Sequence, residues 1–266
     1  MKKVAVILIL VGLIGAVFTA KDFFTRENIK GEAYFSSMDI EDIKITSDVA
    51  NILVLPANSD DIRVKWEDSF LKSNRKNDFV SINEEDSELV ITAGDKSFFS
   101  INFFGFNFFN KRQVEVYLPE KQYRSIVIHN DIGSTNISSI KVDHLTTETS
   151  VSNLTIKDVQ ANDIRATSDV GLITLEDFTG ELFAKSSVGN ISIRTEEITN
   201  AMEIESDIGN IKLTVPTIPD NISFYTHSEI GSVNVFGEKG SYHNEQADHN
   251  ISLETSVGNI TVKSLE

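Results

Sequence analysis

The sequence predicts an all-β protein, a parallel β-helix that follows one N-terminal transmembrane helix. Three observations predict it. A short motif (Ser/Thr, Asp/Ser, Val/Ile, Gly, Asn, Ile) recurs along the chain at intervals of 19, 19, 18, 20, 22 and 27 residues. Apolar residues alternate with polar ones around each copy of the motif. A charge-free apolar run lies near the N-terminus. A period near 19 is too short for pairs of helices or propeller blades and suits one coil of a β-solenoid.

The composition excludes several classes of protein. The 266 residues contain 24 Lys and Arg, 40 Asp and Glu, and no Cys, which gives a formal charge of −16. This charge argues against nucleic acid as a partner, because each phosphate contact needs a basic group. The lack of Cys excludes disulfides, thiolate metal sites, Cys nucleophiles and a lipid-modified N-terminal Cys. An apolar fraction of 40% is sufficient for a core.

The N-terminal run extends from Val4 to Ala20 and follows two Lys residues. Its 17 residues would span roughly 25 Å as a helix, close to the ~30 Å hydrocarbon core of a bilayer. A cleaved signal peptide is the first alternative, but a cut after Ala20 would put Phe18 where a small residue is needed. A buried soluble helix is the second. We expect an uncleaved single-pass anchor within residues 1–24, with the N-terminus cytoplasmic and the main domain outside the cell membrane.

The remaining chain divides into three parts. Residues 25–40 are expected to form a linker. Residues 41–124 form an irregular N-terminal part of the solenoid and contain a Phe-rich insert at 97–110. Residues 125–266 form the regular solenoid, interrupted by a polar loop at 237–250. This loop accounts for the 27-residue interval.

Each copy of the motif predicts two inward-facing strands joined by a corner. Side chains two apart share one face of a strand. In one coil the expected inward side chains are Met202, Ile204, Ser206, Ile208, Ile211, Leu213 and Val215. Gly and Asn tolerate a positive φ and are expected to form the corner. The repeat places its corner glycines at Gly133, Gly171, Gly189, Gly209, Gly231 and Gly258.

A third apolar column predicts a triangular coil. Its spacing is 19, 19, 20 and 20 residues. The members of this column are Ile140, Val159, Phe178, Ile198 and Ile218. Three inward faces per coil, with coils about 4.8 Å apart, describe a triangular parallel β-helix.

The position before the corner Val or Ile alternates between acidic and Ser residues. In chain order it is Asp131, Ser150, Asp169, Ser187, Asp207, Glu229 and Ser256. Alternation keeps carboxylates on neighbouring coils apart and so reduces their repulsion. It fails only at Asp207 and Glu229, which makes this pair the best candidate for a cation site if the column binds one.

The sequence contains no motif of a known catalytic site. Asp131, Asp169 and Asp207 would lie roughly 9.6 Å apart, near the upper end for an inverting glycosidase, but no Lys or Arg accompanies them in the repeat. Two His residues and Asp248 share the polar loop and are expected to be solvated rather than to hold a metal. We therefore predict no catalytic, cofactor-binding or metal-binding residues, and a protein that is not an enzyme.

The Phe-rich insert contains 7 of the 17 Phe residues. They are Phe98, Phe99, Phe103, Phe104, Phe106, Phe108 and Phe109. They could pack on the solenoid or close its end. However, three adjacent Phe pairs cannot all point to one side of a strand. An exposed cluster would mark a membrane or a protein partner, and flanking Lys96, Lys111 and Arg112 could meet lipid headgroups.

The repeats and the anchor together resemble the putative-adhesin family of bacterial envelope proteins, a domain of unknown function with recurring Ser-x-x-Gly-Asn-Ile strands. The resemblance covers roughly residues 125–266, and more loosely 40–266. It implies a right-handed single-stranded β-helix without established catalysis. Members with one N-terminal anchor are of the LiaG type, linked to the envelope stress response of Gram-positive bacteria. Ala50 and Ser152 depart from the family pattern at the Gly position.

The function expected from these features is binding or regulation at the bacterial envelope, in the envelope stress response. A surface adhesin is the first alternative and a polysaccharide-active enzyme the second. Only about 20 residues separate the anchor from the first good coil, which favours an envelope protein partner within or just above the membrane. The last motif ends at Val262, so the coil from Ile251 to Val262 is expected to be an open end available for self-association.

Overall fold

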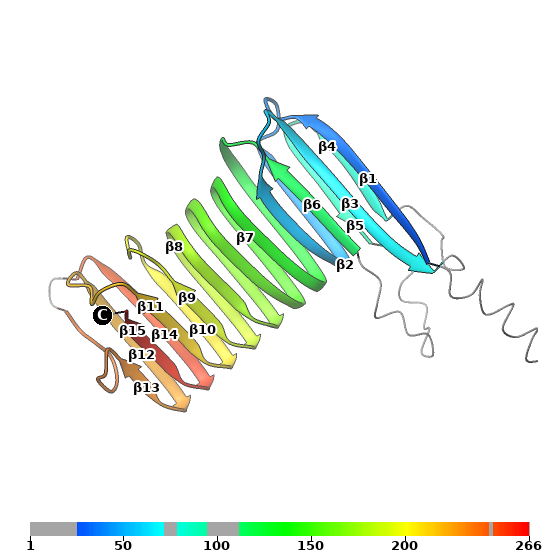
Figure 1. Ribbon diagram of the computed structural model, residues 1–266. Coiled ribbons are helices and arrows are strands. Elements are labelled where there is room, and N and C mark those ends of the chain that lie inside the picture. The colour runs from blue at the N-terminus through cyan, green and yellow to red at the C-terminus, as the bar shows by residue number, and fades with distance from the viewer. Residues whose placement is uncertain (1–25, 72–78, 95–111, 245–246, 266) are drawn as a thin grey trace, which may run out of the picture.

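A computed structural model describes residues 26–71, 79–94, 112–244 and 247–265 (Figure 1). The described chain is all-β, as predicted, and its fifteen strands belong to one sheet. The strands are β1 (Arg26–Ser36), β2 (Asp42–Pro56), β3 (Asp61–Leu71), β4 (Val80–Glu85), β5 (Glu88–Ala93), β6 (Arg112–Leu118), β7 (Gln122–Val170), β8 (Ile173–Val188), β9 (Ile191–Arg194), β10 (Met202–Ile208), β11 (Ile211–Val215), β12 (Ile222–Ile230), β13 (Val233–Val235), β14 (His249–Val257) and β15 (Ile260–Ser264).

The expected transmembrane segment, Val4 to Ala20, lies outside the described residues, as does the Phe-rich insert. Among the residues that the structure does describe, no helix has the length and apolar character needed to cross a bilayer.

The coils stack through parallel strand pairs, which gives a β-solenoid-like rod. Leu154 of β7 pairs with Ile173 of β8, which pairs in turn with Ile191 of β9 and then Ile211 of β11. All four side chains are buried. Equivalent apolar residues of successive coils therefore lie above one another and form a continuous core.

The corner differs from the predicted one. Ser206 is buried, whereas Asp207 and Ile208 both face outward, and Ile208 is 53% exposed. The expectation that the corner Val or Ile points inward is therefore wrong. The alternation of inward and outward side chains is interrupted by two successive outward residues before Gly209, rather than at Gly209 itself. The same outward column contains Ile132, Val151, Val170, Val188, Ile208, Val257 and Ile230.

Glycine is required at the corner because neighbouring coils approach closely. A Cβ on Gly209 would lie 1.9 Å from the carbonyl oxygen of Gly189. All six corner glycines have a carbonyl oxygen of the next coil within 2.0 Å of where a Cβ would be. The inward Ser206 hydroxyl donates to this same Gly189 carbonyl at 3.1 Å.

The corner Asn residues do not adopt positive φ angles, contrary to the prediction. Their side chains instead connect the coils. The Asn190 side-chain carbonyl accepts a hydrogen bond from the backbone N–H of Asn210 at 2.8 Å, and that of Asn210 accepts one from Asn259 at 2.9 Å. The Gly-Asn pair thus combines close backbone approach with a ladder of side-chain acceptors.

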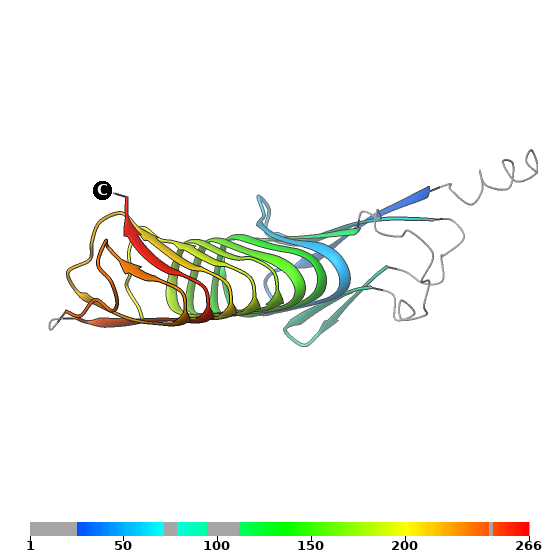
Figure 2. The ribbon, with the colours of Figure 1, turned by 90° about the horizontal axis from the view of Figure 1, so that it is seen from below.

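The coils are not stacked in chain order at the C-terminal end. Strands β14 and β15 lie between β10/β11 on one side and β12/β13 on the other (Figures 1 and 2). The Ile251–Val262 coil is therefore internal, which contradicts the expectation of an open end there. The insertion also places Ser256 between Asp207 and Glu229. The adjacent acidic pair expected from the sequence therefore does not form.

The last coil of the rod, formed by β12 and β13, is partly covered by the 237–250 segment. The backbone N–H of Phe224 donates to the Tyr242 carbonyl at 2.7 Å, and the reverse bond is 3.0 Å. The rings of Phe224, Phe236 and Tyr242 meet edge to face. The described residues around Tyr242 therefore cap this end of the rod rather than form a detached surface loop.

The N-terminal end of the rod has two layers (Figure 2). One contains β1, β3, β6 and the second half of β2, and the other contains β4, β5 and the first half of β2. Residues 26–36 form β1 and pair antiparallel with β3, so the linker predicted for residues 25–40 is wrong over this stretch. Ile29, Ala33 and Phe35 alternate with exposed polar residues and are half-buried, which is the pattern of a strand with one covered face.

The third inward column is buried at four of its five positions. Ile140, Val159, Phe178 and Ile198 are at most 6% exposed, whereas Ile218 is 51% exposed. The prediction fails at Ile218 because the chain leaves the regular coil after β11 and crosses to the end of the rod. Ser139, Asp158 and Asp177, each preceding a member of this column, have φ near +50°.

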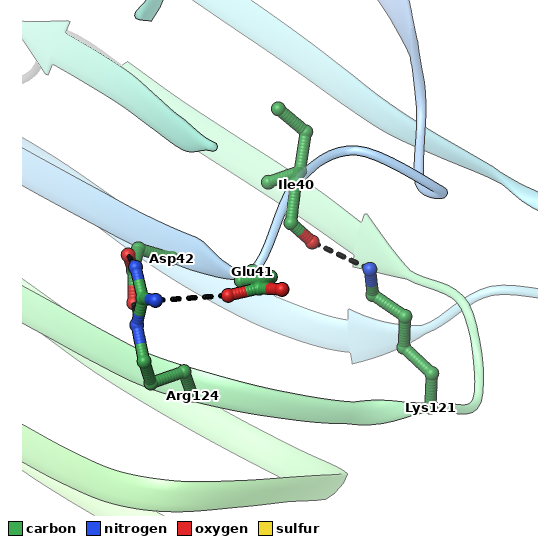
Figure 3. A network of polar contacts seen from close by, with 5 residues as sticks. All are labelled: Ile40, Glu41, Asp42, Lys121 and Arg124. Carbon is green, nitrogen blue, oxygen red and sulfur yellow. Dashed lines mark hydrogen bonds and ion pairs between the residues drawn. The ribbon is translucent and has the colours of Figure 1, made fainter. Parts of the chain in front are cut away.

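Two basic residues at the start of β7 join it to the segment before β2 (Figure 3). The Lys121 ammonium donates to the carbonyl oxygens of Ser37 and Ile40. Arg124 binds both carboxylate oxygens of Asp42 and lies 2.9 Å from Glu41. Burial lowers the pKa of Lys121, and the nearby carboxylates of Glu41 and Asp39 oppose this.

Candidate ligand groove on the side of the rod

One row of outward side chains crosses five coils on the side of the rod. Strand register aligns them in the order Arg165, Phe183, Glu203, Ser252 and Tyr225. The first four each lie between buried neighbours on their strands, and Tyr225 follows buried Phe224 and is itself exposed, so all five point away from the core. Thr146 borders the same surface.

The row encloses a groove with a volume of about 630 Å³, which lies within the range of roughly 300–1,000 Å³ typical of ligand sites. At one end the Arg165 guanidinium stacks on Phe183, 4.2 Å from its ring centroid. At the other end Tyr225 is 48% exposed and meets His243 edge to face at 6.3 Å. Ala201 and Ser252 lie between the aromatic rings, and because their side chains are small they leave the space that forms the groove.

Three carboxylates give the groove its charge. Glu203 belongs to the row itself, and Asp163 and Glu181 lie side by side in adjacent strands. His144 Nδ1 is 2.5 Å from the Asp163 carboxylate. Against these three carboxylates, the described lining of the groove has the single guanidinium of Arg165, so the groove presents a surplus of negative charge to a ligand. The exposed ring of Tyr225 and the half-buried ring of Phe183, beside carboxylates, suit binding of a partly apolar, hydroxylated or cationic ligand.

The residues singled out from the sequence lie elsewhere. The seven Phe residues of the insert fall outside the described residues. Asp131, Asp169 and Asp207 each lie two residues before a corner glycine, and a Ser-bearing coil separates each from the next. Ser150 lies between the first two, 3.5 Å from Asp131. In the polar loop, His243 contacts Ser223 and Tyr225. Within the described ranges, no three His, Asp or Glu side chains cluster closely enough to hold a metal ion.

The sequence contained a signal for the groove that the repeat pattern obscured. Phe183 stands between Leu182 and Ala184, both of which face inward. A large aromatic residue at an outward position of a regular coil is unusual and indicates a surface with a role. Tyr225 follows inward Phe224 in the same way. Only the strand register shows that Phe183 and Tyr225, 42 residues apart in the sequence, border one groove.

These features define a β-solenoid-like protein with a candidate ligand groove along its side. The chain belongs to the DUF4097 family, described as Toastrack, whose model matches residues 40–179 and 133–263. This supports the resemblance to adhesin-like domains of unknown function at the level of the family. No curated protein matches the sequence.

Several solved structures are similar in part. A putative cell adhesion protein from Clostridium sporogenes shares 14% identity, with coverage of 90% of this chain and 100% of that chain and a TM-score of 0.43. A putative adhesin from Bacteroides fragilis shares 13% identity, with coverage of 89% and 97% and a TM-score of 0.46. A putative adhesin from Parabacteroides distasonis shares 14% identity, with coverage of 89% and 95% and a TM-score of 0.42.

Proposed function

We propose that this chain is a membrane-anchored, extracytoplasmic binding protein of the bacterial envelope that takes its ligand in the lateral groove. The observation that carries the proposal is the row of outward residues that places Phe183 and Tyr225 at the two ends of one hollow. A stack of regular coils needs no outward aromatic residues for its stability. Two of them around one concave surface therefore support a binding role.

The chemistry of the groove favours a saccharide chain as ligand. The apolar faces of sugar rings can pack on Phe183 and Tyr225, while hydroxyl or amino groups can donate to the carboxylates of Asp163, Glu181 and Glu203. The surplus of carboxylates disfavours polyanionic polymers. The same surplus favours glycans that are neutral or carry free amino groups.

We propose binding without catalysis. Hydrolysis by paired carboxylates requires two environments that drive their pKa values apart. Glu181 and Glu203 are both exposed and Asp163 is half-exposed, so the three carboxylates share one open, aqueous setting. This arrangement supports hydrogen bonding to a ligand rather than division into an acid and a base.

Cosedimentation of the full chain in detergent with purified cell-wall glycan tests the proposal. Phe183→Ala and Tyr225→Ala should each weaken binding about tenfold or more, as loss of an aromatic anchor does. Tyr34→Ala is the matched control, because Tyr34 is also exposed but lies on β1 at the other end of the rod. Equal binding by all three variants would refute the groove as the site.

The location follows from the anchor proposal. In cells stripped of their wall, external protease should digest a tag placed after Glu266, and a protected tag would refute the extracytoplasmic assignment. β1 begins six residues after Ala20, so an anchored domain would stay close to the bilayer. This supports a LiaG-like role in the envelope stress response, with a ligand or envelope partner on the same cell. Binding of the chain to the surface of other cells, rather than to the wall of the cell that carries it, would favour an adhesin.

A further inference from the structure

The described part of the sheet has four edges, and three of them are protected against pairing with another chain. β13 has only three residues. β12 is covered in part by the backbone pairing of Phe224 with Tyr242. β4 has six residues and ends in Glu84 and Glu85, both exposed. Short length, a covering segment and charge are the usual means of blocking a sheet edge.

The fourth edge, β1, is not short and is not covered by another segment among the described residues, so it shares with β4 only the protection of charged side chains. It has 11 residues without proline, pairs in unbroken register with β3, and has no other partner among the described residues. Figure 1 shows it at the end of the rod, beyond β3. Of its four charged residues, Arg26, Glu27, Lys30 and Glu32, the last two have opposite signs and flank Gly31. In an antiparallel second copy of the strand, Lys30 of one chain would lie opposite Glu32 of the other, so the two strands would not repel each other at these positions.

We propose that β1 pairs antiparallel with β1 of a second copy of this chain, about a two-fold axis at Gly31. In this register Lys30 faces Glu32 of the second copy, Asn28 faces Tyr34 and Ile29 faces Ala33, while Glu27 faces Phe35 near each end of the paired stretch. Two rods would then join end to end through one continuous sheet.

The neighbouring strands continue the charge pattern across this axis. Within one chain, Glu67 pairs with Lys30 at 3.3 Å, and Lys65 lies opposite Glu32 and Glu115. Across the proposed interface the row becomes Glu67, Lys30, Glu32, Lys65 and Glu115, with the last three from the second copy. Each charge is flanked by opposite charges. This complementarity identifies a second copy, rather than an unrelated strand, as the partner.

The arrangement also agrees with the proposed anchor. A two-fold axis normal to the membrane keeps the N-termini of both chains at the same height above the bilayer. Both anchors can therefore enter one membrane while the β1 strands lie parallel to its surface.

Cysteine crosslinking tests the register, because the native chain has no Cys. Full-length Lys30→Cys and Glu32→Cys chains are coexpressed and oxidised in intact cells. Directly opposed residues lie about 4.5–5.5 Å apart at Cα, within disulfide range. The mixture should form a disulfide-linked dimer, whereas either variant alone should not. Glu203→Cys with Lys212→Cys, both exposed and remote from β1, is the matched control pair.

Two results would overturn the proposal. One is crosslinking of the mixture no stronger than that of the control pair, with thermal unfolding showing all four variants folded. The other is equal crosslinking of either single variant alone, which would indicate collision or a different register. Light scattering of the unmodified full chain in detergent gives an independent measure. It should yield the mass of two chains, and the mass of one would also refute the proposal.

Discussion

The backbone N–H of Asn259 donates a hydrogen bond of 2.9 Å to the side-chain carbonyl of Asn210, although 49 residues separate them in the chain. Asn259 in turn accepts from the backbone N–H of Ser232 at 2.9 Å. The final coil of the sequence is therefore held between two earlier coils. This order determines which coil ends the rod and which carboxylates become neighbours.

The first prediction concerns the inserted coil. Among the described strands, β12 pairs only with β14, and β13 only with β15. Deletion of residues 249–266 should therefore release residues 222–235 as well, and their backbone amides should lose protection in hydrogen exchange. Retained protection at Phe236, whose backbone N–H donates to the deleted Val262 carbonyl at 2.9 Å, would show that this coil can dock directly on the coil of β10 and β11, as chain order suggests.

The second prediction compares three side chains at one corner. Ile211→Ala should cost about 2–4 kcal/mol, because Ile211 is buried in the core. Ile208→Ala should cost about 1 kcal/mol, since half of that side chain remains in water. Lys212→Ala, at an exposed position, should change the free energy of unfolding by less than about 0.5 kcal/mol. Urea unfolding measures all three, and equal losses at Ile208 and Ile211 would contradict the observed phase of the corner.

The third prediction concerns the corner carboxylates. Ser256→Asp would place a carboxylate between Asp207 and Glu229 and should destabilise the fold by about 1 kcal/mol. The loss should shrink at high salt, because the charges are exposed. Ser192→Asp is the matched control, since Ser192 lies beside Lys212 and Thr174. An equal, salt-independent loss in both variants would exclude repulsion as the cause.

The fourth prediction concerns the pH dependence of stability. Burial lowers the pKa of Lys121 below its ordinary value of 10.5. Between the lowered pKa and 10.5 the unfolded chain therefore binds more protons at this group than the folded chain. Stability contributed by Lys121 should consequently rise with pH through this window.

Lys121→Met provides the comparison, because it keeps the length of the side chain and removes the titrating group. The difference in unfolding free energy between native and variant chains, measured by denaturant titration from neutral pH to 10.5, should grow with pH. A constant difference would contradict the lowered pKa. At every pH the variant should be less stable by about 1–3 kcal/mol, because the carbonyls of Ser37 and Ile40 lose their buried donor.

Local periodicity was sufficient to predict the coils. Strand alternation around Met202, Ile204 and Ile211 reflects the two-residue repeat of an extended chain, and a side chain's face follows from its neighbours in sequence. The conflict at Ile208 arose because two outward residues in succession mark a bend that alternation alone does not locate.

The sequence by itself determined the all-β class, the parallel coils, the recurring Gly-Asn corners and most of the core, because each of these depends on residues close together in the chain. Only the tertiary structure decided the rest. The insertion of β14 and β15, the meeting of Phe183 with Tyr225 across one groove, and the pairing of β1 with β3 depend on which strand edges come together. All coils present nearly the same backbone edge and the same apolar faces, so local pattern cannot rank one stacking order above another. That choice is made by contacts between distant residues, such as the Asn210–Asn259 hydrogen bond and the Ser256 spacer between two carboxylates.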